Sequence, residues 1–167
     1  MTSAILSEDV IALARRVVAE NIAANRKVAV AESCTGGLVC AALTEIAGSS
    51  AVLDRGFVTY SNGSKQQLLG VSDDILEAFG AVSPATAWAM AQGAIQHSDA
   101  DVAVAISGIA GPDGGTPMKP VGTVVFACAH RSQTKEAINA DQRLLDGKDR
   151  SEIRLQATLI ALELLLP

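Results

Sequence analysis

The segment 101–108, DVAVAISG, constrains the fold more than any other part of the sequence. It contains an unbroken apolar run, which is typical of a strand that other elements cover on both faces. Strands of this kind belong to largely parallel sheets packed between helices. A second short, β-rich run, KVAVAES, occupies residues 27–33. The two runs together predict the centre of an α/β fold.

Helices are expected to alternate with the strands. Ser7 followed by two acidic residues is typical of a helix start, and apolar residues then recur at helical spacing. The last two strands are separated by a short turn, so we expect an antiparallel hairpin. The pattern predicts one domain, residues 1–167, built as a three-layer α/β/α sandwich around a mixed sheet of about five strands. The expected helices span 8–25, 35–48, 61–70, 72–80, 83–98 and 149–166, and the further strands span 52–61, 123–130 and 134–144.

Composition and charge exclude several classes of partner. The chain has 167 residues and a net charge of −5 with no basic run, which argues against nucleic acid. Its apolar stretches fall well short of the ~18 residues that a spanning helix needs, so no membrane partner is expected. The N-terminus, MTSAILSEDV, lacks the basic start and apolar run of a signal peptide, and we predict a cytoplasmic protein. Three widely spaced cysteines, Cys34, Cys40 and Cys128, form neither a disulfide framework nor a metal set.

Apolar content also bears on assembly. Hydrophobic residues make up 49% of the chain, and the sequence ends in the leucine-rich stretch LIALELLL (159–166). A surplus of apolar surface usually becomes an interface between subunits. We therefore predict a homodimer or a higher homo-oligomer.

The stretch AESCTGG (31–37) is the strongest candidate for chemistry. It lies where an expected strand ends and an expected helix begins, and helix N-termini offer free N–H groups and partial positive charge. Glycines let a ligand approach the backbone, so the turn can hold an anion or an oxyanion beside Ser33 or Cys34. Thr35 is expected to cap the helix. A capped helix with glycines for tight packing explains the same residues equally well, so the spacing leaves both interpretations open.

A serine nucleophile needs a base, and the sequence offers few. The motif G-x-S-x-G is absent, and both His97 and His130 lie in polar contexts typical of solvated side chains. The remaining candidate is Lys65 in TYSNGSK, which can act as a base if burial lowers its pKa far below ~10.4. Tyr60, the only tyrosine, ends the preceding strand and can place its hydroxyl in the same cleft. A surface lysine and a packing tyrosine are the simpler interpretations.

Two further segments suit an anionic ligand. The loop 108–122 holds five of the 14 glycines and three of the five prolines, and it follows a buried strand, where open α/β sheets bind ligands. It is neither a P-loop nor a dinucleotide fingerprint. In DRSEIR, Arg150 and Arg154 lie four residues apart near a helix start, where cations oppose the helix dipole. An anionic partner, either a phosphate or an acidic side chain, is therefore expected for them.

These motifs together resemble one known family. AESCTGG, GFVTYSNGSK, GAVSP, SGIAGPDGG with KPVGTV, and DRSEIR, in this order, resemble the C-terminal domain of competence-damage-inducible protein CinA, whose stand-alone members include nicotinamide-nucleotide amidohydrolases. The match runs from about residue 8 to residue 166. The resemblance implies a three-layer α/β/α fold and no metal or other cofactor. It also implies hydrolysis of nicotinamide mononucleotide to nicotinate mononucleotide and ammonia by a serine–lysine mechanism.

Carried over by motif, the resemblance implies Ser33 as the nucleophile, Lys65 as the base and Tyr60 as an active-site partner. Ser107 stands where the family usually has threonine, so the hydroxyl is kept and the methyl group is lost. Glycine-rich turns and Arg150 would hold the phosphate, and backbone N–H groups at 34–37 or 107–108 would hold the oxyanion. The implied substrate-binding residues are Glu32, Thr35, Gly36, Gly37, Ser107, Gly108, Gly111, Gly114, Gly115 and Arg150.

Two other classes of function stay open at this point. Cys34 can be the nucleophile of an amidase for another small amide, because thiols are intrinsically better nucleophiles than hydroxyls. A nucleotide-binding or regulatory module without catalysis would also bind the ligand. Such a module would be stabilised by the nucleotide and would not turn it over.

Overall fold

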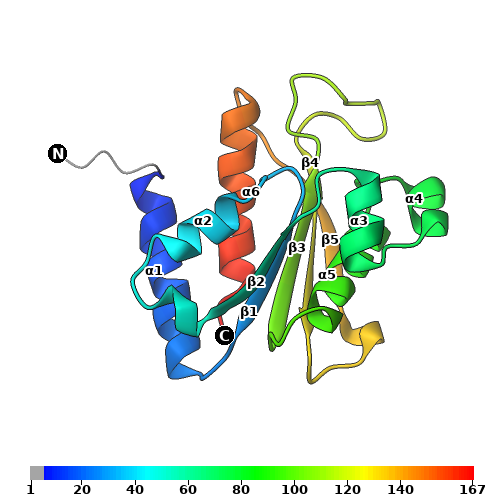
Figure 1. Cartoon of the computed structure of the whole chain (residues 1–167). Helices are drawn as coiled ribbons and strands as arrows, with labels where there is room; N and C mark the ends of the chain where they lie inside the picture. Colours follow the sequence, from blue (N-terminus) through cyan, green and yellow to red (C-terminus); the bar gives the residue numbers. More distant parts are fainter. Residues whose placement is uncertain (1–5) are drawn as a thin grey trace.

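A mixed five-stranded sheet forms the middle of the molecule in the computed structural model, which describes residues 6–167 (Figure 1). Its strands are β1 (Val28–Glu32), β2 (Leu53–Val58), β3 (Val102–Gly108), β4 (Thr123–His130) and β5 (Asn139–Leu144). In the order β2-β1-β3-β4-β5, the first three strands are parallel and the last two pair in antiparallel fashion. The predicted mixed sheet is therefore confirmed. The first five residues of MTSAILSEDV, which the signal-peptide prediction uses, lie outside the described residues.

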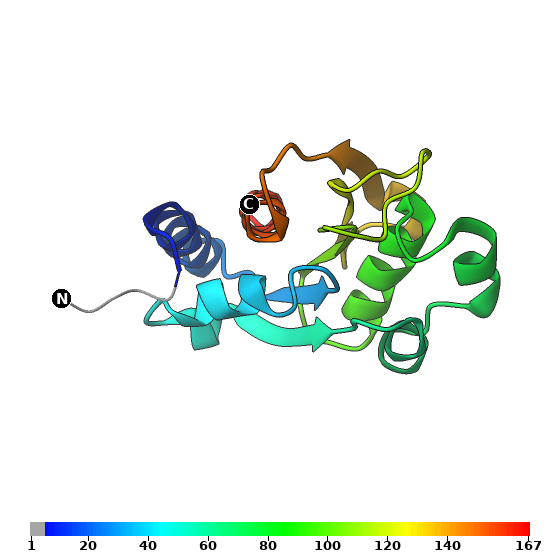
Figure 2. The ribbon, with the colours of Figure 1, turned by 90° about the horizontal axis from the view of Figure 1, so that it is seen from above.

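Helices cover both faces of the sheet. They are α1 (Glu8–Ala23), α2 (Leu38–Thr44), α3 (Asn62–Leu69), α4 (Asp73–Phe79), α5 (Pro84–Gln96) and α6 (Arg150–Leu164), and short 3-10 helices lie at Ser49–Ala51 and Lys135–Ala137. Seen from above, α1, α2 and α6 lie on one side of the sheet, and α3, α4 and α5 lie on the other (Figure 2). The predicted three-layer α/β/α arrangement is therefore confirmed.

The two faces of the sheet carry side chains of different size. Along β1, β3 and β4 the larger side chains, such as Val30, Val104 and Phe126, pack with α1, α2 and α6. The residues between them, such as Ala31 and Ala105, pack with α5, which is itself rich in alanine. Because successive residues of a strand face opposite sides, small side chains on one face let a helix approach closely. Helix α5 therefore lies against β1, β3 and β4.

Polar side chains begin four of the helices. Ser61, Ser72, Ser83 and Asp149 each accept a hydrogen bond from a backbone N–H in the first turn of the helix that follows. Such caps satisfy N–H groups that have no partner within the helix. Ser72 and Ser83 take this role at the starts of α4 and α5. Ser7 precedes α1 as expected, but its side chain makes no capping hydrogen bond.

Several predicted elements are shorter in the structure, and two of them are shortened by another local structure. The helix expected over 35–48 is reduced to α2, because Gly36 and Gly37 have φ angles of 61° and 100° and form a turn before the helix. Both angles lie in the left-handed region that glycine adopts without strain. The strand expected over 134–144 is reduced to β5, because Lys135–Ala137 form a 3-10 helix.

The leucine-rich C-terminal stretch is used inside the molecule. Leu162 and Leu165 are fully buried in the core that α1, α2 and α6 form with the sheet. Part of the apolar surplus that suggested an interface is thus taken up by this core, and the predicted homodimer stays a prediction. Within residues 6–167, no helix is long and apolar enough to cross a membrane.

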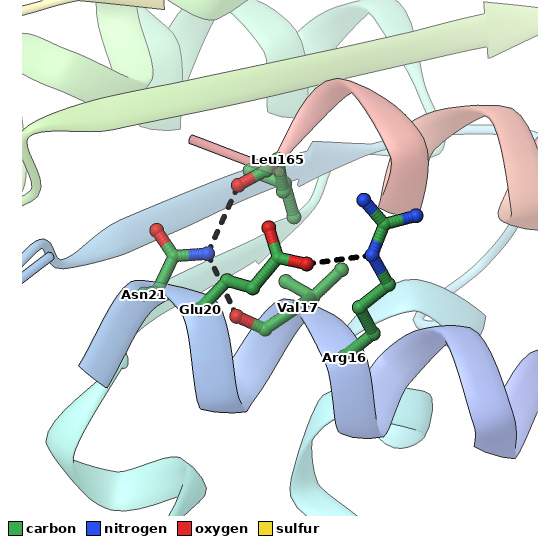
Figure 3. Close-up of polar contacts among 5 residues, drawn as sticks. All are labelled: Arg16, Val17, Glu20, Asn21 and Leu165. Carbon is green, nitrogen blue, oxygen red and sulfur yellow. Dashed lines mark hydrogen bonds and ion pairs between the residues drawn. The ribbon is translucent and has the colours of Figure 1, made fainter. Parts of the chain in front are cut away.

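The C-terminal end of α6 is tied to α1 by a buried asparagine (Figure 3). The side-chain amide of Asn21 donates to the carbonyl oxygen of Val17 at 2.8 Å and to that of Leu165 at 3.0 Å. Arg26 Nε donates to Asn21 Oδ1 at 2.7 Å, and its Nη2 donates to the same Leu165 oxygen at 2.5 Å. These bonds satisfy a carbonyl group at a helix end, where intrahelical partners are lacking.

Asn21→Ala is expected to lower the free energy of unfolding by about 2 kcal/mol, because it leaves buried polar groups without partners. Arg16→Ala is the matched control on the same helix. Arg16 Nε lies 2.6 Å from Glu20 Oε1 in an exposed pair (Figure 3), and such a pair contributes about 0.5 kcal/mol or less. Urea denaturation of the two variants measures both changes. Equal losses would contradict the role assigned to Asn21.

Candidate active site

Polar residues from three neighbouring strands meet where the parallel strands end. Ser33 follows β1, Tyr60 lies shortly after β2, and Ser107 lies near the end of β3. The carboxyl ends of parallel strands share one edge of the sheet, which is where open α/β sheets bind ligands. A cavity of about 170 Å³ lies there, lined by Ser33, Cys34, Tyr60, Lys65, Ala81, Val82, Ser107, Gly108, Ala110 and Arg150. The structure therefore brings the three predicted catalytic residues into one cavity.

Lys65 and Ser33 are in direct contact within this cavity. Lys65 Nζ donates to Ser33 Oγ at 3.0 Å and to the carbonyl oxygen of Thr59 at 2.8 Å. The lysine is 1% exposed, and no acidic side chain of the described residues forms an ion pair with it. Burial lowers the pKa of Lys65 from its ordinary value, because a charged amine loses its hydration there. Burial thus makes the uncharged amine, the state that can accept a proton, more accessible beside the serine hydroxyl than it is for a solvated lysine.

Helix α3 is held close to α5 so that Lys65 reaches the cavity. A capping box between Ser61 and Ser64 starts α3. At its other end, α3 meets Gly93 of α5, where an added Cβ would lie 2.0 Å from the carbonyl oxygen of Leu69. Any side chain at Gly93 would push α3 away, and Lys65 would move with it.

A buried carboxylate organises the turn after β1. Glu32 is fully buried and accepts hydrogen bonds from the N–H groups of Gly37 (3.0 Å), Val39 (3.2 Å) and Cys40 (3.0 Å). It satisfies donors at the start of α2 and complements the positive end of the helix dipole. Glu32 is buried away from the cavity wall and acts as the acceptor that holds the turn, and its predicted contact with substrate stays a prediction. The expectation that Thr35 caps the helix is wrong, because Gly37 stands at the cap position.

Three other residues predicted to bind substrate also lie outside the cavity wall. The N–H of Gly36 donates to the carbonyl of Ser33 at 3.0 Å, and that of Gly37 donates to Glu32, so neither is free for an oxyanion. The buried hydroxyl of Thr35 has no hydrogen-bond partner among the described residues. The sequence places these residues at a helix start, where free N–H groups are normal. In the folded protein the carboxylate of Glu32 takes the N–H of Gly37, and the carbonyl of Ser33 takes that of Gly36.

Cys34 borders the cavity, but its environment is that of a buried thiol. Its side chain is 5% exposed and belongs to the core that lies against α2 and α6. The structure thus places the thiol both in this core and on the cavity wall. Burial raises the pKa of Cys34 to about 11, because a thiolate would be poorly solvated there. The thiol is therefore protonated at neutral pH, which disfavours it as a nucleophile.

Arg150 connects the cavity to a second hollow. Its Nη2 donates to the hydroxyl of Tyr60 at 2.9 Å, and its Nη1 donates to the carbonyl of Gly111 at 2.8 Å. The second hollow has a volume of about 300 Å³, is lined by Lys148 and the acidic Asp149 among others, and shares Ala110 and Arg150 with the first. Across residues 6–167, neither cation forms an ion pair with an acidic side chain. Both are therefore available to an anionic ligand.

The glycine-rich loop after β3 contributes less to the cavity than the sequence predicts. Gly108 lines the cavity, but Gly111, Gly114 and Gly115 do not. Gly111 and Gly114 have positive φ angles, and a Cβ at Gly115 would lie 2.8 Å from the backbone nitrogen of Val121. These three glycines are therefore required by the conformation and close packing of the loop itself.

Sequence reasoning missed part of the cavity wall. Ala81 and Val82 line it, and the hydroxyl of Ser107 donates to the carbonyl of Ala81 at 2.8 Å. Both residues lie in GAVSP, a segment of the family resemblance, but small apolar side chains carry no chemical signal of their own. Arg154 was expected to bind an anion, and it donates instead to two backbone carbonyls of the turn after β1. Neither histidine lines the cavity.

The fold and the cavity define an α/β protein with a small, partly polar site at the carboxyl ends of its parallel strands. The chain belongs to the CinA C-terminal domain family, whose sequence profile matches residues 10–167. This membership confirms the family predicted from the motifs.

Individual relatives extend this match. The chain is 53% identical over 138 residues to nicotinamide-nucleotide amidohydrolase PncC of Enterobacter agglomerans, a match that covers 80% of this chain and 79% of that protein. It is 63% identical over 103 residues to a putative competence-damage inducible protein of Symbiobacterium thermophilum, covering 62% of this chain and 24% of that protein. The crystal structure of the competence/damage inducible protein CihA from Agrobacterium tumefaciens matches with a TM-score of 0.91 and 47% identity, over 96% of both chains.

Stability is expected to depend on pH through Lys65. Its pKa is lower in the folded protein than the ordinary value of 10.5, which holds in the unfolded chain. At a pH between the lower pKa of the folded protein and the ordinary pKa, Lys65 is protonated in the unfolded chain and uncharged in the folded protein. The folded state therefore gains stability as pH rises. The free energy of unfolding of the parent protein should therefore rise relative to that of Lys65→Met as pH increases toward the ordinary pKa of 10.5.

Urea denaturation of both proteins at several pH values measures this difference. Lys135→Met is the control, because Lys135 is exposed and its removal should give a difference that does not change with pH. A constant difference for Lys65→Met as well would show that burial does not lower the pKa of Lys65.

Proposed function

We propose that this protein hydrolyses the carboxamide of nicotinamide mononucleotide to nicotinate mononucleotide and ammonia, with Ser33 as the nucleophile and Lys65 as the base. The contact of 3.0 Å between Ser33 Oγ and the buried Lys65 Nζ carries the proposal. The prediction that the chain is an enzyme is borne out by its relatives named nicotinamide-nucleotide amidohydrolase PncC. The substrate proposed here is the one those names indicate.

The first half of the reaction transfers the acyl group to the serine. The uncharged amine of Lys65 accepts the proton of Ser33 while Oγ attacks the carboxamide carbon. The C=O double bond opens, and its oxygen takes the negative charge. When the C–N bond then breaks, the nitrogen takes the proton from Lys65 and leaves as ammonia. Ser33 is left as an ester of nicotinate mononucleotide.

Water completes the cycle. Lys65 accepts a proton from a water molecule whose oxygen attacks the ester carbon. The bond between this carbon and Ser33 Oγ then breaks, and Oγ takes the proton back from Lys65. Nicotinate mononucleotide leaves with the new carboxyl group, and both residues return to their starting protonation states.

The two neighbouring hollows suit the two ends of the substrate. The cavity of about 170 Å³ beside Ser33 suits the pyridine carboxamide, and the hollow of about 300 Å³ beyond Arg150 suits the ribose and phosphate. Arg150 and Lys148 supply positive charge there, and a guanidinium can bind a phosphate through two parallel N–H groups. Tyr60 accepts a hydrogen bond from Arg150 at the boundary and thereby orients the guanidinium.

Ser33→Ala is expected to lose nearly all ammonia release from nicotinamide mononucleotide and to keep its fold and nucleotide binding. Lys65→Met should lose as much, because members of one catalytic unit do not act additively. Cys34→Ala is the matched control at the next residue and should stay within a factor of about ten of the parent, or ~1.4 kcal/mol of barrier. An ammonia assay, with circular dichroism to monitor folding, measures all three.

The proposed nucleophile is wrong if Ser33→Ala keeps most of its activity, or if Cys34→Ala abolishes turnover in a folded protein. Nicotinamide mononucleotide could also raise the melting temperature of the parent protein without any release of ammonia. That result would identify the protein as a nucleotide-binding module instead.

Arg150→Lys is expected to raise KM for nicotinamide mononucleotide about tenfold and to leave kcat little changed, because the lost bidentate contact binds substrate and transition state alike. Arg143→Lys is a suitable control, since Arg143 pairs with Asp141 on β5 and lines neither hollow. Steady-state kinetics of both variants test the assignment. A fall in kcat with KM unchanged would place Arg150 in the chemical step.

A further inference from the structure

Arg154 holds the turn that carries Ser33, although it does not line the cavity. Its Nε donates to the carbonyl of Cys34 at 3.0 Å, and its Nη2 donates to the carbonyl of Thr35 at 3.0 Å. No acidic side chain of residues 6–167 forms an ion pair with it. One guanidinium from α6 thus binds the two backbone carbonyls that directly follow the nucleophile.

Most N–H groups of this turn already have acceptors. The N–H of Gly36 donates to the carbonyl of Ser33, that of Leu38 donates to the carbonyl of Thr35, and those of Gly37, Val39 and Cys40 donate to the Glu32 carboxylate. The N–H groups of Cys34 and Thr35 remain, and within the part of the chain that the structure describes they donate to no carbonyl, carboxylate or hydroxyl group of another residue.

The bound carbonyls determine where these two N–H groups point. A trans peptide directs its C=O and its N–H in opposite directions. The bond from Arg154 to the Cys34 carbonyl therefore turns the N–H of Thr35 away from α6. The bond from Gly36 to the Ser33 carbonyl fixes the N–H of Cys34 in the same manner. A positively charged guanidinium bound to a carbonyl oxygen also polarises that peptide group, and the N–H of the peptide becomes a stronger hydrogen-bond donor.

We propose that Arg154 is a positioning residue, and that two N–H groups receive the oxygen that becomes negative during attack: that of Cys34, which lines the cavity, and that of Thr35, the buried residue directly behind it. This inference rests on the proposed function. In that step the bond between Ser33 Oγ and the carboxamide carbon forms, the π electrons of the C=O move to its oxygen, and the serine proton passes to Lys65. Two N–H donors held in advance stabilise the new charge without reorganising.

Arg154→Met is expected to lower kcat by about 100-fold, the size of effect seen when one oxyanion donor is removed. Its KM should stay within a factor of about three, because the walls of both hollows remain and only the transition state loses an interaction. Arg154→Lys should fall between the parent and Arg154→Met. An ammonium group keeps the charge but cannot bind two carbonyls through a planar fork.

Chemical rescue gives a readout that a purely structural role would not produce. Arg154 also lines a hollow of about 350 Å³ that lies between α1, α2 and α6. Arg154→Ala would open a path from this hollow to the two carbonyls. Ethylguanidinium, added at concentrations that leave the melting temperature unchanged, should then restore part of kcat in Arg154→Ala and none in Ser33→Ala.

Arg26→Met is the matched control. Arg26 makes the same kind of contact at the other end of α6, where it donates to the carbonyl of Leu165. Its replacement should lower the melting temperature and leave kcat unchanged. The proposal is overturned if Arg154→Met behaves in the same way, if it raises KM alone, or if ethylguanidinium restores nothing.

Acylation of Ser33 by p-nitrophenyl acetate separates this inference from the substrate assignment, because it needs the oxyanion site whatever the natural amide is. One possible result is that the parent protein releases no ammonia from nicotinamide mononucleotide but is acylated at Ser33. If Arg154→Met then slows acylation by about 100-fold, the substrate is wrong and the role of Arg154 stands. Equal acylation rates in the two proteins, or no acylation of the parent, overturn that role.

Discussion

Close packing of α5 against the alanine face of the sheet is the contact on which the candidate site depends. Because the side chains on both surfaces are small, the helix lies near the strands. Helix α5 in turn presents Gly93 to the carbonyl of Leu69, which fixes the end of α3. Helix α3 carries Lys65, whose Nζ reaches Ser33 Oγ at 3.0 Å. A larger side chain anywhere along this path would separate the two reactive groups.

Arginines in this protein bind backbone carbonyls more than carboxylates. Arg26, Arg131 and Arg154 each donate to carbonyl oxygens at the ends of helices or in turns. Among the described residues, the acidic partners of arginine are confined to two partly or fully exposed pairs, and such pairs contribute little to stability. A planar guanidinium has several donors in fixed positions, so it can hold neighbouring segments at defined distances. The polar interactions thus serve mainly to fix the turns between elements.

Local signals in the sequence predicted most of the elements, because apolar runs and capping serines act over a few residues. The candidate site required the family resemblance, since Ser33 and Lys65 lie 32 positions apart and no local pattern indicates that they meet. The same limit explains the error at Thr35. A helix-start pattern favours a threonine cap, whereas the carboxylate of Glu32 reaches the amides from the preceding strand. The close approach at Gly93 also depends on a distant segment.

The hydrogen bonds of Asn21 and Arg26 to Leu165 have a practical consequence. They hold the C-terminal end of α6 beside the end of α1 that precedes β1, whereas Ser33 follows the other end of that strand. The C-terminus therefore lies at the end of the sheet opposite to the carboxyl ends of the parallel strands (Figure 1), and it is at those carboxyl ends that the cavity lies. A tag, a fusion partner or a solid support joined after Pro167 would leave the cavity facing the solvent.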